Sequence, residues 1–459
     1  MFNRLEISAT LIAPSGLYLR YMSIVLLSIY FTLVVFMAYR RPTLAVAGLL
    51  VILPLYGVRF SILGIPGTLL EVSIWAVTLG WFVREWQLYG PPPLPFTKTL
   101  DKANPFAPYL LPILLWEVAA LVSVMVSPNL TAALGVWKAY FVDPLLVFVL
   151  VVVTFRHSAD QWLVLAALGV SAAAISVVAW YQKLTGTFLP EPWAHTLPLR
   201  VTSVYSYPNA VGLYVGPILA MEITWLLQRF KKQTHNLVEM FWYLFAALLG
   251  AGAIIFSVTR GAWVGVAVSV LVALLFTFRA RCKYIIGTVA VFIFLSALVP
   301  AVRERILPYA TLQSTSGKVR LIVWQETLAM LRDHPLTGAG LAGYQTTLAP
   351  YHQPWHKEAS PYALEVFLYP HNIFLNFWSE LGLGGLLVFM WLVVVFVRLI
   401  WQRRERTLSV VALAGMTALI VHGLVDVPYF KNDLAVLFWV IIALPLLEPT
   451  PTLPVTETI

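Results

Sequence analysis

Long apolar runs recur along the whole chain, and they constrain its fold more than any other feature of the sequence. Most of these runs are long enough to cross a hydrocarbon core about 30 Å thick as a helix. Of the 459 residues, 60% are apolar and only 11% are charged, whereas about 25% are charged in soluble domains. The sequence therefore predicts an all-α polytopic membrane protein.

We expect about 12 to 13 transmembrane helices in a single integral membrane domain over residues 1–459. The first run ends in Arg40-Arg41-Pro42 without a small-residue cleavage site, so we expect it to be a retained span. The second run is the shortest. The expected spans are residues 21–39, 43–57, 67–84, 108–126, 135–154, 161–181, 206–227, 239–257, 261–278, 284–300, 373–397, 408–424 and 431–447.

The net charge of +9 comes largely from basic clusters in short loops, so it does not require an acidic partner such as nucleic acid. The positive-inside rule places these loops in the cytoplasm. The connections at 182–205, 258–260, 301–370 and 425–430 then lie outside. The clusters are Arg229, Lys231 and Lys232; Arg279, Arg281 and Lys283; and Arg398, Arg403, Arg404 and Arg406.

One long hydrophilic segment, residues 301–370, interrupts the closely spaced spans, and we expect it to form an extracytoplasmic (periplasmic) loop carrying part of a functional site. Within it, residues 320–335 predict an amphipathic helix at the membrane boundary, ended by Pro335. The apolar positions of this helix at helical spacing are Leu321, Trp324, Leu328 and Leu331.

Two apparent motifs do not indicate a ligand. "GAGLAG" at 338–343 fits the dinucleotide pattern but lies outside any α/β unit, so we interpret it as a turn that needs small residues. His352 and His356 are four residues apart, but Pro354 argues against the helix that would align them, and His334 has no partner at ligand spacing. We expect no metal and no cofactor.

Five charged residues lie inside or beside expected spans. A charge at a helix centre costs about 2.5 to 3.5 kcal/mol on insertion scales, which makes such residues candidates for function. We favour internal ion pairs or snorkelling to the interface. The residues are Glu71, Glu117, Lys138, Asp143 and Glu222.

Three arginines converge on the expected outer face. Arg260 occupies the turn between two spans, Arg200 precedes a span, and Arg320 begins the amphipathic helix. Each alone fits an interfacial anchor. Together they suit an anion, because guanidinium groups bind phosphate through two parallel hydrogen bonds and a diphosphate can engage more than one of them.

A histidine lies at the start of the apolar run after the long loop. Pro370 fits the first turn of a helix, which would place His371 at the positive end of the helix dipole and favour a neutral, proton-accepting imidazole. Glu380 lies nine residues further on, about 13.5 Å along a helix axis. We therefore expect Glu380 to pair inside the bundle and not with His371.

Four stretches resemble the O-antigen ligase and Wzy-type polymerase superfamily in order and approximate spacing, over about residues 200 to 430. The resemblance implies a metal-independent, inverting GT-C-type glycosyltransferase that moves a glycan from undecaprenyl diphosphate to an acceptor hydroxyl, such as lipid A core, outside the bacterial cytoplasmic membrane. It implies that His371 is catalytic, with Asn372 and Glu380 supporting it, and that Arg260 and Arg320, and more loosely Arg200, bind the diphosphate. The stretches are "RVTSVYSYPNAVGLY", "SVTRGAWVG", "VRLIVWQETLAMLRDHPLTGAGLAGY" and "HNIFLNFWSELGLGGLLVF".

Three alternatives remain open at this point. A polymerase would use the same donor to extend the chain on its carrier, and the pattern of histidine, glutamate and arginines favours the ligase branch. A lipid-linked glycan flippase would use the in-span charges as a path, but it predicts inverted repeats, which we do not find. A non-catalytic scaffold would leave the histidine and the arginines unexplained.

Overall fold

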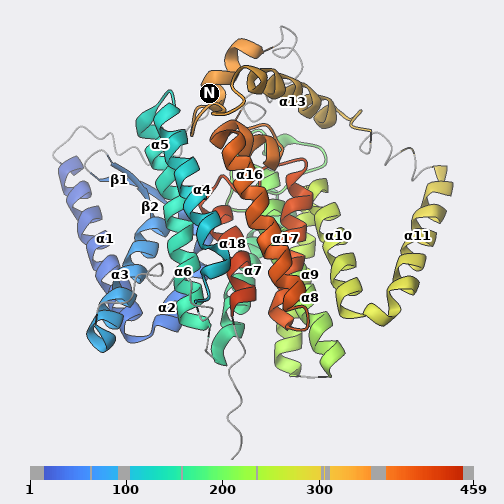
Figure 1. The fold of residues 1–459 in the computed structure, drawn as a ribbon, viewed down its shortest axis with the longest axis horizontal. Helices are drawn as coiled ribbons and strands as arrows, with labels where there is room; N and C mark the ends of the chain where they lie inside the picture. Colours follow the sequence, from blue (N-terminus) through green and yellow to red (C-terminus); the bar gives the residue numbers. More distant parts are fainter. Residues whose placement is uncertain are drawn as a thin grey trace, which may run out of the picture.

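The computed structural model describes residues 15–62, 65–90, 104–156, 159–233, 236–300, 304, 311–352 and 368–447. Helices running side by side form a bundle, with α13 lying across one end of it (Figure 1). The helices are α1 (Ser15–Arg40), α2 (Pro42–Val51), α3 (Leu69–Tyr89), α4 (Ala107–Val126), α5 (Leu130–Trp137), α6 (Asp143–Phe155), α7 (Trp162–Thr185), α8 (Pro208–Lys232), α9 (Leu237–Ser257), α10 (Arg260–Thr277), α11 (Cys282–Leu298), α13 (Thr315–Asp333), α14 (Tyr344–Leu348), α16 (Ile373–Gln402), α17 (Thr407–Gly423) and α18 (Asn432–Ala443).

Every expected span coincides with a helix, although several bounds shift by a few residues. Among the described residues, seven helical segments are long and apolar enough to cross a membrane, and four shorter apolar helices accompany them. One of the seven, Leu130–Phe155, joins α5 and α6 through a π-helical turn at Lys138–Val142. The polytopic all-α character is confirmed in this coarse sense, and the number of 12 to 13 spans stays a prediction.

A short β-hairpin departs from the expected all-helical fold. Strands β1 (Arg59–Ile62) and β2 (Ile65–Thr68) pair antiparallel, with Arg59 opposite Thr68. Thr68 then caps α3, because its hydroxyl accepts the Glu71 N–H while the Glu71 carboxylate accepts the Thr68 N–H. The hairpin is therefore joined directly to the start of a capped helix, an arrangement that the apolar pattern alone does not indicate.

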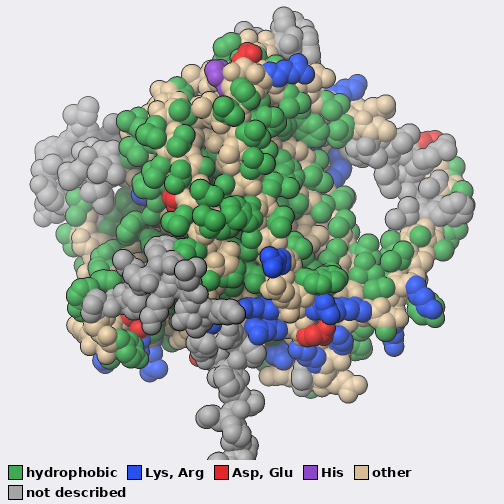
Figure 2. Space-filling model, viewed as in Figure 1, with side chains coloured by type: hydrophobic (Ala, Val, Ile, Leu, Met, Phe, Trp, Pro, Cys, Tyr) green, Lys and Arg blue, Asp and Glu red, His purple; other side chains and the backbone are tan. Residues whose placement is uncertain are grey.

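The surface of the bundle is mostly apolar, and basic side chains gather mainly at the end opposite α13 (Figure 2). The last turn of α8 carries Arg229, Lys231 and Lys232 at that end. This separation of an apolar belt from a basic end fits a membrane protein with one positively charged flank.

The interfacial helix expected at 320–335 is α13, which runs from Thr315 to Asp333. Its inward face differs in part from the expected one: Leu331 is buried as expected, but Leu321 and Leu328 are 38% and 40% exposed, whereas Val323 and Met330 are fully buried. α13 crosses the ends of other helices instead of packing along one of them (Figure 1). Its contact face therefore depends on the elements beneath it and follows only one of the three expected leucines, Leu331.

The "GAGLAG" segment lies between two helices, as a turn of small residues. The N–H of Ala339 donates to the Ser379 carbonyl at 2.7 Å. A Cβ at Gly338 would collide with that carbonyl, and one at Gly340 would lie 2.7 Å from the Cα of Ser127. Both glycines also have positive φ angles of 62° and 78°. The segment therefore requires glycine for close approach, in agreement with a turn that needs small residues.

Glu380 fastens this turn to the bundle. Its Oε2 accepts the N–H of Ala342 at 2.8 Å. Two residues later, α16 kinks at Gly382, where φ is 70° and a Cβ would collide with the Leu336 carbonyl. The internal partner of Glu380 is thus the backbone N–H of Ala342, and the carboxylate joins the segment after α13 to α16.

Most of the five in-span charges have polar partners. Lys138 Nζ lies 3.2 Å from Glu71 Oε2, and Trp75 Nε1 donates to Asp143 Oδ1 at 3.0 Å. Glu117 accepts the indole N–H of Trp137 at 2.9 Å. Among the described residues, Oε1 of Glu222 is buried without a hydrogen-bond partner. For Glu71 and Lys138, the expectation of an internal ion pair is confirmed.

Candidate functional site

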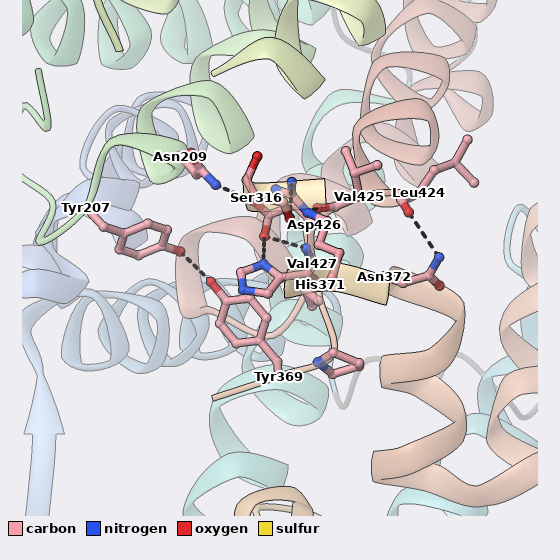
Figure 3. Close-up of polar contacts among 12 residues, drawn as sticks. Tyr207, Asn209, Ser316, Tyr369, His371, Asn372, Leu424, Val425, Asp426 and Val427 are labelled. Atoms are coloured by element: carbon pink, nitrogen blue, oxygen red, sulfur yellow. Dashed lines mark hydrogen bonds and ion pairs between the residues drawn. The ribbon is translucent and has the colours of Figure 1, made fainter. Parts of the chain in front are cut away.

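The site lies where α16 begins, beneath α13 and beside the connection between α17 and α18 (Figures 1 and 3). The N-cap of α16 is Asn372, whose side-chain oxygen accepts the N–H groups of Phe374 and Leu375, both at 3.0 Å. Its Nδ2 donates to the Leu424 carbonyl at 3.0 Å. Asn372 therefore fixes the start of the helix to the α17–α18 connection.

His371 precedes the N-cap and lies outside the first helical turn, which corrects the expectation based on Pro370. Its φ of 48° is left-handed, a conformation that costs a non-glycine residue about 1 to 3 kcal/mol and often marks functional sites. Trp324 of α13 donates its indole N–H to the Pro370 carbonyl at 2.8 Å. The backbone around His371 is thus held from two sides.

The imidazole of His371 faces a buried carboxylate. Nδ1 lies 3.5 Å from Oδ1 of Asp426, an ion-pair distance slightly longer than a good hydrogen bond, and the His371 side chain is 12% exposed (Figure 3). Asp426 itself is 0% exposed. A carboxylate facing Nδ1 favours the tautomer with a proton on that atom, which leaves Nε2 as the proton acceptor.

Asp426 has further partners that keep it ionised. Its Oδ2 accepts the Asn209 amide at 2.9 Å, and its Oδ1 accepts the Val427 N–H at 2.9 Å. Burial acts to raise the pKa of Asp426, but the contact with His371 and the fields of neighbouring cations outweigh burial and lower it below the usual range. The carboxylate is therefore negative at any physiological pH.

Arg200 lies one contact away from this pair. Its Nη2 donates to Asn209 Oδ1 at 3.0 Å and its Nε to the Ser257 carbonyl at 3.0 Å. The guanidinium also lies over the Trp193 ring, 5.1 Å from its centroid. Arg200 thus positions Asn209, which in turn holds Asp426, and a diphosphate contact of Arg200 stays a prediction.

Arg320 bonds the backbone of Val425, and Arg260 begins the helix that lies beside the same residue. Arg320 donates from Nε to the Val425 carbonyl at 2.8 Å and weakly from Nη1 to Ser316 at 3.5 Å. Within the described residues, its Nη2 has no protein partner. Arg260 is exposed at the start of α10, and a Cβ on the adjacent Gly261 would lie 3.0 Å from a Val425 methyl group. Arg320 therefore contacts the residue next to Asp426, and a diphosphate contact of Arg320 or Arg260 stays a prediction.

Asp426 and Asn209 were not predicted from the sequence as site residues. Asp426 is the acid in the 425–430 connection, which the charge pattern already assigned to the same face as His371. Asn209 follows Pro208 in one of the stretches quoted above. Glu380, by contrast, contacts the backbone of Ala342, so any support that it gives to His371 passes through the fold.

One protein-family model matches a segment of the chain that carries part of this site. Residues 245–390 match the family model described as O-antigen ligase, Wzy_C. The matched segment includes Arg260, Arg320 and His371, whereas Arg200 and Asp426 lie outside it. None of the curated proteins compared with the chain matches it.

Proposed function

We propose that this chain, which residues 245–390 place in the O-antigen ligase and Wzy superfamily, is a membrane glycosyltransferase acting as a ligase. Its donor is a glycan on undecaprenyl diphosphate, and its acceptor is a hydroxyl of lipid A core or a similar glycan. The reaction takes place on the outer face of the bacterial cytoplasmic membrane. The observation that carries this proposal is the buried His371–Asp426 pair beside Arg320.

His371 is the general base. With Nδ1 directed at Asp426, its Nε2 takes the proton of the acceptor hydroxyl, and the buried carboxylate stabilises the imidazolium that forms. Asp426 stays negative because its pKa is lowered, so its contribution is complete above the ordinary aspartate pKa of about 3.9 and is lost only at still lower pH.

Arg320 and Arg260 stabilise the leaving group. The acceptor oxygen forms a bond to the anomeric carbon while the bond from that carbon to the diphosphate oxygen breaks. The electron pair leaves with undecaprenyl diphosphate, and the acceptor proton goes to His371. Guanidinium groups positioned before the reaction bind the growing negative charge on the diphosphate. This chemistry needs no nucleotide sugar, and we propose that it proceeds without a metal.

The topology of the site can be tested directly. We expect alkaline phosphatase fused within residues 301–370 to be active, and a fluorescent protein at the same positions to be dark, because this segment faces the periplasm. The matched fusion in the basic connection at Arg403–Arg406 should give the opposite result, since the positive-inside rule places it in the cytoplasm. If the 301–370 fusions report the cytoplasm, the proposed site lies on the wrong side of the membrane for its substrate, and the proposal fails.

Arg320→Lys is expected to slow transfer by about ten- to a hundredfold, since losing a charged hydrogen bond costs about 1.5 to 3 kcal/mol. Lysine keeps the charge but cannot reproduce the planar fork of the guanidinium. Arg332→Lys, on the exposed last turn of the same helix, is the matched control and should be neutral. Initial rates with labelled donor measure both. Normal turnover in Arg320→Lys would show that Arg320 anchors the helix at the membrane surface and does not bind the diphosphate. Arg260→Lys tests the diphosphate contact of Arg260 in the same way.

The activity itself is tested with purified protein in liposomes, labelled undecaprenyl-diphosphate glycan and rough lipopolysaccharide. We expect the label on the lipid A core and free undecaprenyl diphosphate as the second product. Label that appears instead on longer carrier-linked chains identifies a polymerase with the same base and arginines. Movement of the donor across the bilayer without bond cleavage would identify a flippase and overturn the proposal.

A further inference from the structure

A group of tyrosines extends from His371 on the side away from the carbonyl groups that Arg320 bonds. The rings of Tyr369 and His371 meet edge to face, with centroids 4.8 Å apart and planes at 63°. The Tyr369 hydroxyl lies 3.4 Å from that of Tyr207. Figure 3 shows Tyr207 and Tyr369 on one side of His371, with Ser316 and Val425, the carbonyl partners of Arg320, on the other.

Lys431 extends this group. Its Nζ lies 3.8 Å from the centroid of the Tyr207 ring, a close cation–π contact. Tyr207 and Lys431 are the N-cap residues of α8 and α18, so both lie at helix starts on the side of the bundle that carries His371. Tyr207, Tyr369 and Lys431 are all half-buried and therefore reachable from outside. We call these three residues the tyrosine platform.

Three further side chains, those of Tyr56, Tyr205 and Asp433, connect the chain segments next to the tyrosine platform. The hydroxyl of Tyr205 donates to Asp433 at 3.2 Å, and Asp433 is 1% exposed two residues after Lys431. The rings of Tyr56 and Tyr205 are 6.3 Å apart. Tyr205 and Asp433 each lie two residues from a member of the platform, Tyr207 and Lys431, so their hydrogen bond joins the two chain segments that carry these members.

We propose that the tyrosine platform binds the acceptor glycan, with a sugar ring against Tyr207 and its hydroxyls bonded by Lys431 and the tyrosine hydroxyls. Ligand sites typically combine aromatic walls with a few placed polar groups, as this surface does. The assignment to the acceptor rests on the proposed function. In a direct displacement, the attacking and leaving oxygens lie on opposite sides of the anomeric carbon. Arg320 marks the leaving side, so the tyrosines on the other side of His371 face the acceptor.

The test compares KM values for acceptor and donor in Tyr207→Ala, with rough lipopolysaccharide or the free oligosaccharide repeat as acceptor. We expect the acceptor KM to rise about ten- to a hundredfold, because a stacking ring is lost. The donor KM and the kcat at saturating acceptor should stay within about threefold. Tyr207→Phe keeps the ring and should change the acceptor KM by only about threefold. Tyr181→Ala, at a tyrosine that is 48% exposed on α7, is the matched control and should match wild type.

An unchanged acceptor KM in a folded Tyr207→Ala protein, or a rise in the donor KM instead, would overturn the acceptor assignment and leave the glycosyltransferase proposal standing. If wild-type protein transfers glycan to neither acceptor, the proposed function fails. In that case, the binding of core oligosaccharide, measured by tryptophan fluorescence, tests independently of activity whether the tyrosine platform binds the glycan. Binding that is lost in Tyr207→Ala and kept in Tyr181→Ala supports it, and no binding to wild type refutes it.

Discussion

Replacing His371 by alanine is expected to abolish measurable glycan transfer, a loss of at least about 10² to 10⁴ in rate if His371 is the general base. Insertion, expression and donor binding should stay near wild type, because the His371 side chain contacts the α17–α18 connection without forming part of the apolar core. Transfer is measured with labelled donor and rough lipopolysaccharide, and donor binding by native mass spectrometry in detergent.

His352 provides the matched control for this experiment. It lies in the same outer segment and also faces a buried carboxylate, with Nδ1 3.1 Å from Glu326 Oε2. His352→Ala should therefore disturb local packing to a similar extent while leaving transfer intact. A well-folded His371→Ala protein that transfers glycan at a near-normal rate would refute the mechanism and the strongest reason for considering this chain an enzyme.

Asp426→Asn is expected to reduce transfer by about 10² to 10⁴, although the substitution hardly changes the shape of the side chain. A neutral amide no longer stabilises the imidazolium, and it can present an N–H to His371 that favours the wrong tautomer. Donor binding should change little, since Arg320 bonds the Val425 carbonyl and not the carboxylate. The kcat, the donor KM and the melting temperature of the variant distinguish this effect from unfolding.

The control for Asp426 is Asp333→Asn. Asp333 is exposed at the end of α13 and accepts a hydrogen bond from the Tyr351 hydroxyl at 2.6 Å. Asp333→Asn therefore removes the same carboxylate charge at a position outside the site. It should keep full activity. Equal losses of activity in the two variants, or a fully active Asp426→Asn, would show that the buried carboxylate does not act on His371.

The spans were predictable because burial in a membrane follows composition over long windows. Long apolar runs such as 373–397 carry that information locally, and α16 begins at Ile373 as expected. Positions that depend on several chain segments were harder to predict. The inward face of α13 includes Val323 and Met330, because it follows the elements beneath the helix, which no pattern within residues 320–335 encodes.

The sequence proposes candidate residues of the site but not their arrangement. His371, Arg260 and Arg320 were proposed from charge and resemblance, and the structure places His371 and Arg320 at the α17–α18 connection and Arg260 at the start of α10. The pairing of His371 with Asp426 joins residues 55 positions apart in the sequence, so it depends on tertiary contacts. The same is true of Arg200, whose guanidinium is directed to Asn209 by the Ser257 carbonyl and the Trp193 ring.

The position of α18 has a consequence for how the molecule is made. All twelve of its residues are buried, although it is the last membrane helix of the described chain, and the connection before it carries Asp426 and Lys431. Because a chain emerges from the ribosome with its N-terminal part first, the other helices enter the membrane before their central neighbour exists. They must stay loosely associated until α18 inserts among them. A chain that ends before α18 still contains Asp426, but it lacks Asp433, and the connection that carries Asp426 and Lys431 is then anchored at the α17 end alone.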